Sequence, residues 1–103
     1  MSMYKVLIVC QGGMSSSFVV NKIKAAFRDH NEEIEMHAYA AMELVDYIDE
    51  VETVLVAPNV TYMMDNIEAT CKAHGMEPIV IPLDYYGQMD GEAIRKLIID
   101  SKK

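Results

Sequence analysis

Basic side chains are scarce in this sequence of 103 residues. It carries 9 lysines and arginines against 16 aspartates and glutamates, so its formal net charge is −7. Nucleic-acid binding depends on basic side chains that displace counterions from phosphates, and anionic lipid attracts the same side chains. The charge balance argues against nucleic acid and against a peripheral role on anionic lipid. It leaves room for a small, localised anion site.

Long apolar runs are missing as well. Only four apolar residues, 6–9, follow Lys5 before a polar loop begins, and no run approaches the roughly 20 residues that a bilayer-spanning helix needs. We therefore expect no signal peptide, no direct membrane insertion and a cytoplasmic location. The two cysteines, Cys10 and Cys71, are far apart in the sequence, and we expect both to be reduced thiols.

The chain also lacks linkers, repeats and low-complexity tracts, so we expect one domain over residues 1–103. Apolar runs predict strands at 6–9, 34–39, 54–57 and 79–81; three of the four are continuously apolar, as is typical of parallel sheets. Apolar residues at helical spacing predict helices at 19–27, 41–48, 60–74 and 93–98.

This order of elements predicts an α/β fold. Right-handed crossovers then give a four-stranded parallel sheet in the order 2-1-3-4 with helices on both faces, as in flavodoxin-like and low-molecular-weight phosphatase-like proteins. We expect Val45 on the inward face of the second helix, Gly75 as the C-cap of the third and Asp90 as the N-cap of the last.

The residues after the first predicted strand have the composition of an anion-binding loop. Cys10 ends the strand, glycines occupy positions 12 and 13, and serines 15–17 open the next helix. Such a loop can turn several backbone amides inward, at the positive end of a helix dipole. The same donors stabilise a thiolate, so Cys10 is predicted to be a nucleophile. The alternative is a small buried thiol that merely ends a strand.

One absence separates two kinds of cysteine chemistry. Cysteine-type phosphatases carry an arginine six residues after the nucleophile, but this position is Ser16, and no charged residue occurs from position 6 to position 21. Without a guanidinium to stabilise transition-state charge, hydrolysis should be slow. The loop therefore favours relay of a phosphoryl group, and a low-molecular-weight cysteine-type phosphatase is the alternative.

Two more loops are expected at the same edge of the sheet. Asn59 and Tyr62 follow the third predicted strand, and Tyr86 follows the fourth. They are candidates for the rim of the site, although Asn59 or Thr61 could equally cap the following helix.

Three segments of the chain resemble one protein family. Residues 9–17, Val-Cys-Gln-Gly-Gly-Met-Ser-Ser-Ser, are similar to the cysteine-x-x-glycine-methionine-serine-threonine-serine signature of the enzyme IIB proteins of the lactose/cellobiose (diacetylchitobiose) family. These proteins belong to the bacterial phosphoenolpyruvate-dependent sugar phosphotransferase system. Residues 57–63 resemble the family's segment after the third strand, and Tyr86-Gly87 followed by Asp90-Gly91 resembles the segment before the last helix. Ser16 stands where threonine is usual and keeps the hydroxyl.

The resemblance implies that Cys10 accepts a phosphoryl group from a phosphohistidine on an enzyme IIA and passes it to a sugar held by a membrane enzyme IIC. It implies no metal and no cofactor. The family's sugars are mostly β-linked disaccharides such as cellobiose, diacetylchitobiose or lactose, and nothing in the sequence selects one. The residues whose amides would hold the phosphate are Gln11, Gly12, Gly13, Met14, Ser15 and Ser16.

Cys71 and His74 are spaced as two metal ligands would be. Two ligands do not complete a site, and both residues are predicted on the apolar face of the third helix, so core packing is favoured.

Overall fold

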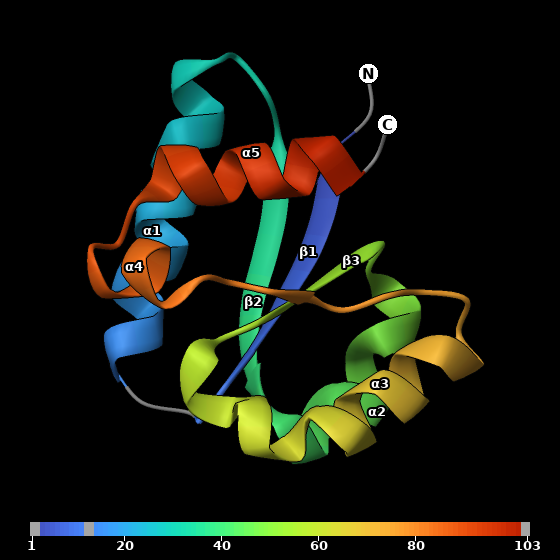
Figure 1. Cartoon of the computed structure of the whole chain (residues 1–103). Helices are drawn as coiled ribbons and strands as arrows, with labels where there is room; N and C mark the ends of the chain where they lie inside the picture. The colour runs from blue at the N-terminus through green and yellow to red at the C-terminus, as the bar shows by residue number, and fades with distance from the viewer. Residues whose placement is uncertain (1–2, 12–13, 102–103) are drawn as a thin grey trace.

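A parallel sheet of four strands forms the centre of the molecule in the computed structural model, which describes residues 3–11 and 14–101 (Figure 1). The strand order is β2-β1-β3-β4, and every neighbouring pair is parallel. The strands are β1 (Tyr4–Cys10), β2 (Ile34–Ala40), β3 (Thr53–Val56) and β4 (Ile79–Val80). The sheet and its order confirm the prediction.

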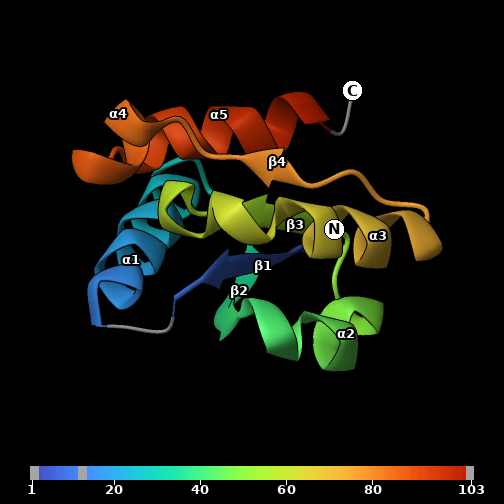
Figure 2. The same ribbon diagram turned by 60° about the horizontal axis from the view of Figure 1, so that its bottom comes forward.

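Helices cover both faces of the sheet. One face is covered by α1 (Met14–Asp29) and α5 (Gly91–Ser101). The other is covered by α2 (Leu44–Tyr47) and α3 (Met64–Ala73), together with the 3-10 helices η1 (Ala41–Glu43), η2 (Ile48–Glu50) and η3 (Pro58–Met63). A short helix, α4 (Leu83–Gly87), connects β4 to α5. Figure 2 shows α5 and α2 on opposite sides of the strands.

Burial on both faces of the sheet explains why residues 6–9 of the central strand β1 are all apolar. Val6 and Ile8 pack into the core under α1 and α5, whereas Leu7 and Val9 pack into the core under α2 and α3. All four side chains are fully buried. Because side chains alternate across a strand, a strand covered on both faces needs apolar residues at every position.

The second helical segment differs from its prediction. Residues 41–50 form η1, α2 and η2 in succession instead of one α-helix, and Val45 is 60% exposed where an inward side chain was expected. The Glu43 carboxylate accepts a hydrogen bond from the Ala40 amide at 2.9 Å and stabilises a tight 3-10 first turn. Leu44 and Ile48, which were expected on the same inward face, are buried as predicted.

The third helix also begins differently. Pro58 opens η3, and Val60 has non-helical angles (φ −120, ψ 17), so α3 proper begins only at Met64. The N-cap prediction is confirmed, because the Asp90 side chain accepts a hydrogen bond from the Ala93 amide at 3.1 Å. The C-cap of α3 is His74, and Gly75 directly after it has the left-handed φ of 71° that is typical of a glycine ending a helix. Helix α4 was not predicted.

The helix α1 has 16 residues. Over the described ranges, 3–11 and 14–101, none of the helices is both long and apolar enough to span a bilayer.

Candidate functional site

Cys10 is the last residue of β1 and is 2% exposed. Its side chain belongs to the core on the α2 and α3 face, and its Sγ lies 3.8 Å from the main-chain oxygen of Tyr39, to which it donates a weak hydrogen bond. Helix α1, which begins at Met14, packs on the opposite face. Cys10 therefore stands at the carboxyl edge of the sheet. Open α/β sheets bind their ligands at this edge.

A cavity of about 310 Å³ lies beside Cys10. It lies between the segment after β2 and the segment after β3, so its walls come from the two strands that flank β1. None of its described lining residues carries a charge, and most are apolar. Those lining residues are Cys10, Gln11, Ala40, Ala41, Met42, Val60, Tyr62 and Met63.

Tyr62 projects from η3 and is 71% exposed. Its hydroxyl accepts a hydrogen bond from the Gln11 side-chain amide, with Nε2 and the phenol oxygen 3.3 Å apart. This contact joins the segment that follows β1 to the segment that follows β3. The two segments meet because β1 and β3 are neighbours in the sheet, as the predicted strand order requires.

The structure does not place the other predicted site residues in the described lining of the Cys10 cavity. Gly12 and Gly13 lie outside the described residues. Met14, Ser15 and Ser16 form the start of α1. Asn59 is exposed on η3 and is not part of the cavity's described lining. Thr61 donates a hydrogen bond from its hydroxyl to the Pro58 carbonyl at 3.2 Å, within η3.

Tyr86 is partly buried and packs against both hydrophobic cores. It is not part of the described lining of the Cys10 cavity. In the described structure it therefore lies where the two cores meet.

Sequence reasoning missed the wall of the cavity that follows β2. Ala40, Ala41 and Met42 line it, and Met42 is 83% exposed. None of these side chains carries reactive chemistry, so composition alone did not mark them. The predicted strand order contained the signal, because the carboxyl ends of parallel strands lie at one edge and β2 is a neighbour of β1.

A stacked tyrosine pair supports this wall. The rings of Tyr39 on β2 and Tyr47 on α2 are parallel within 3°, with centroids 4.0 Å apart. Burial raises the pKa of the Tyr39 phenol above its ordinary value of 10.0, with smaller contributions from nearby acidic groups, so the ring stays neutral. The stack fixes α2 against the end of β2, next to the carbonyl that faces the Cys10 thiol.

Cys71 and His74 do not point to a common ligand. Cys71 is fully buried and its pKa is raised by that burial. His74, expected on the apolar face, is not part of the core: its side chain is 31% exposed, and its ring contacts the Thr70 carbonyl at 3.0 Å and the Asp49 carboxylate at 2.9 Å. Both cysteines are free thiols. Among the described residues there is no group of three or more His, Cys, Asp or Glu side chains that could hold a metal ion.

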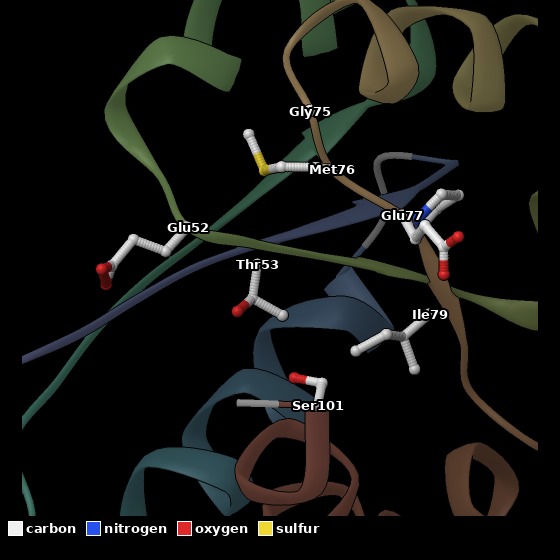
Figure 3. Close-up of a pocket in the computed structure, with 8 residues that line it drawn as sticks. Glu52, Thr53, Gly75, Met76, Glu77, Ile79 and Ser101 are labelled. Atoms are coloured by element: carbon white, nitrogen blue, oxygen red, sulfur yellow. The ribbon is translucent and has the colours of Figure 1, made fainter. Parts of the chain in front are cut away.

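A larger cavity of about 340 Å³ lies at the opposite, amino edge of the sheet. Figure 3 shows its lining, in which the Glu52 and Glu77 side chains extend in different directions. It shares no described lining residue with the Cys10 cavity. It is slightly larger than the Cys10 cavity, but its described lining contains no thiol. The carboxyl edge carries the Cys10 thiol shortly before the start of α1, so we take that edge as the candidate site.

Comparisons with known proteins agree with this geometry. A family model described as "PTS system, Lactose/Cellobiose specific IIB subunit" matches residues 5–97. The oligo-beta-mannoside-specific EIIB component of Bacillus subtilis (strain 168) is 27% identical over 90 residues, which is 87% of each chain.

Two solved structures are similar over nearly the whole chain. The cellobiose-specific phosphotransferase IIB component of Borrelia burgdorferi has a TM-score of 0.81 at 29% identity, covering 96% of this chain and 91% of that one. The lactose-specific IIB domain of Streptococcus pneumoniae has a TM-score of 0.84 at 15% identity, covering 96% and 97%. The second likeness concerns the fold alone.

Proposed function

This chain belongs to the lactose/cellobiose-specific IIB subunits of the sugar phosphotransferase system, and we propose that it carries the phosphoryl group on the Sγ of Cys10. One observation supports this role above the others. Cys10 stands at the carboxyl end of the central strand, beside a cavity and shortly before the start of α1.

The first step is attack by the Cys10 thiolate on the phosphorus of a phosphohistidine carried by an enzyme IIA. A sulfur–phosphorus bond forms while the phosphorus–nitrogen bond breaks, and the leaving imidazole nitrogen takes up a proton. In the second step a sugar hydroxyl oxygen, held by a membrane enzyme IIC, attacks the same phosphorus. The sulfur–phosphorus bond breaks, the hydroxyl proton leaves to solvent, and the thiolate is restored.

Backbone amides would hold the transferred group. The first amides of α1 have no partners within the helix and lie at the positive end of its dipole. We assign the phosphate-binding role to the backbone of residues 11–16. No charged side chain occurs between positions 6 and 21, so no guanidinium would speed hydrolysis, and the phosphocysteine should persist until an acceptor arrives.

The relatives narrow the class of sugar without selecting one. Their names refer to oligo-β-mannosides, cellobiose and galactose, and the first two are β-linked sugars. We propose a β-linked oligosaccharide as the final acceptor, with the carrier acting in the cytoplasm between the two partner proteins.

The test is a phosphorylation assay read by intact mass. The chain is incubated with phosphoenolpyruvate, the general phosphotransfer proteins and an enzyme IIA of the lactose/cellobiose type. We expect a gain of one phosphoryl group, its loss in Cys10→Ser, and its retention in the matched control Cys71→Ala, which removes the other thiol.

Two outcomes would contradict the carrier role: no gain of mass in the wild-type chain, or an unchanged gain in Cys10→Ser. Rapid, continuous release of phosphate from a simple phosphomonoester would instead favour the phosphatase alternative.

A further inference from the structure

Tyr62 is a large aromatic residue whose position burial does not explain. Its side chain is 71% exposed, so little apolar surface is removed from water by holding it there. Its hydroxyl nevertheless accepts the hydrogen bond from Gln11 at 3.3 Å, and both side chains line the cavity beside Cys10.

The backbone that carries Tyr62 is firmly anchored. Val60, two residues earlier, is 1% exposed within the core. At the start of the same segment, the Ala57 amide donates a hydrogen bond to the Val9 carbonyl of β1 at 2.9 Å. The phenol therefore projects from a fixed base.

Gln11 has the opposite character. It is exposed and has left the strand, and two glycines follow it in the sequence. Because Gln11 lies outside the strand pairing, which ends at Cys10, the sheet itself does not fix the direction in which the chain leaves β1 at this residue. A hydrogen bond from Gln11 to an anchored side chain restricts that direction.

We propose that Tyr62 is a positioning residue for phosphoryl transfer, acting through Gln11 on the loop that follows Cys10. This inference rests on the proposed function, because the loop matters only if it holds the phosphoryl group. The main-chain amide of Gln11 is the first in that loop, and catalysis of this kind is sensitive to small misplacements of the groups that hold the substrate.

The alternative is that Tyr62 is simply an aromatic contact for a partner protein. The two roles make different demands on the side chain. Positioning requires the hydroxyl, whereas a docking contact requires the ring. Tyr62→Phe keeps the ring and removes only the hydroxyl, so it separates them.

The experiment measures phosphorylation of Cys10 at varied donor concentration, with two donors. One donor is a charged enzyme IIA of the lactose/cellobiose type, and the other is phosphoramidate, a small phosphorus–nitrogen compound that has no docking surface. We expect Tyr62→Phe to lower the maximum rate roughly 3–10-fold with both donors, the size of effect given by one modest hydrogen bond. The KM for enzyme IIA should stay unchanged.

Variants at Gln11 test whether Tyr62 acts through its hydrogen bond with Gln11. We expect Gln11→Ala to slow transfer by a similar factor, and the double variant Tyr62→Phe/Gln11→Ala to be no slower than either single variant. Tyr4→Phe is the matched control, because it removes a tyrosine hydroxyl at the far end of β1. Urea midpoints should agree among all the variants, which shows that the fold is intact.

A wild-type maximum rate in Tyr62→Phe would overturn the proposal, whether or not the KM for enzyme IIA changed. If Tyr62→Ala, which removes the ring, then raised the KM for enzyme IIA, Tyr62 would be assigned to docking. Effects of the two single variants that multiply in the double variant would also overturn it. If the wild-type chain gains no phosphoryl group from either donor, the carrier role and the positioning role both fail. A phosphorylated wild type with an unaffected Tyr62→Phe removes the positioning role alone.

Discussion

Helix α5 begins at Gly91, which is buried against the backbone of α1. A Cβ atom at this position would overlap the main-chain oxygen of Lys22 and would lie 2.6 Å from its carbonyl carbon and 3.1 Å from the Ile23 nitrogen. The obstacle is backbone rather than a flexible side chain. Gly91→Ala can therefore be accommodated only if α5 moves away from α1.

The size of the effect follows from two opposing contributions. Non-bonded heavy atoms prefer separations of about 3.5–4.0 Å, so the start of α5 must shift by roughly 1 Å, and overpacking of this kind costs about 1–3 kcal/mol. Alanine's better helix propensity returns at most about 1 kcal/mol. We expect a net loss of about 1–2 kcal/mol, which for a chain of this length lowers Tm by roughly 5–15 °C.

The assay is urea unfolding followed by circular dichroism, with Gly87→Ala as the matched control. A Cβ at Gly87, the last residue of α4, meets nothing within 4 Å, so this variant should be unchanged or slightly more stable. If Gly91→Ala were as stable as Gly87→Ala, within about 0.5 kcal/mol, the close packing of α5 on α1 would be refuted.

Thiol reactivity and acid sensitivity give two further predictions. In the native chain iodoacetamide should modify Cys10, which borders a cavity, and spare the fully buried Cys71, whose pKa is raised by burial; peptide mass mapping that found Cys71 modified first would contradict this. The hydrogen bond from Arg95, at 2.7 Å, lowers the pKa of Glu32 below its ordinary value of 4.5, so this pair stabilises the fold above that pH and the contribution is lost as pH falls through the folded-state pKa. Glu32→Gln should therefore lower the free energy of unfolding by about 0.5–1 kcal/mol near pH 7, and by progressively less toward pH 3, in urea titrations. A stability difference between wild type and variant that grew with acidity would contradict this prediction.

The sheet could be predicted because its sequence signal is continuous. A strand segment buried on both faces favours apolar residues at every position, and residues 6–9 of β1 and 54–56 of β3 are apolar without interruption. Chain order and crossover handedness then leave few arrangements. The remaining predicted strand, 34–39, alternates apolar and polar residues, and β2 is an edge strand.

Short helices were harder to predict for a physical reason. The 3-10 turn at 41–43 is stabilised by one side-chain contact from Glu43, and Val45, which was expected inside, is exposed. Helix α4 has only five residues, too few for an apolar period to be visible. Local hydrogen bonds determine the conformation of such short segments, and these hydrogen bonds cannot be read from composition.

One part of the candidate site could likewise be predicted from the sequence, and another part could not. The position of Cys10 before a helix start was predictable from residue types alone. The hydrogen bond between Gln11 and Tyr62 was not, because 51 positions separate the two residues and their contact depends on the irregular course of η3.

The two ends of the described chain lie on the same side of the molecule, away from the cysteine. The Glu52 amide donates a hydrogen bond to the Lys5 carbonyl near the start of β1, and Glu52 lines the amino-edge cavity together with Ser101 at the end of α5. Figure 1 shows the end of α5 near the start of β1 at that edge. A polypeptide fused beyond these two elements would therefore be attached on the side of the sheet opposite Cys10, which suits the fold to modular use.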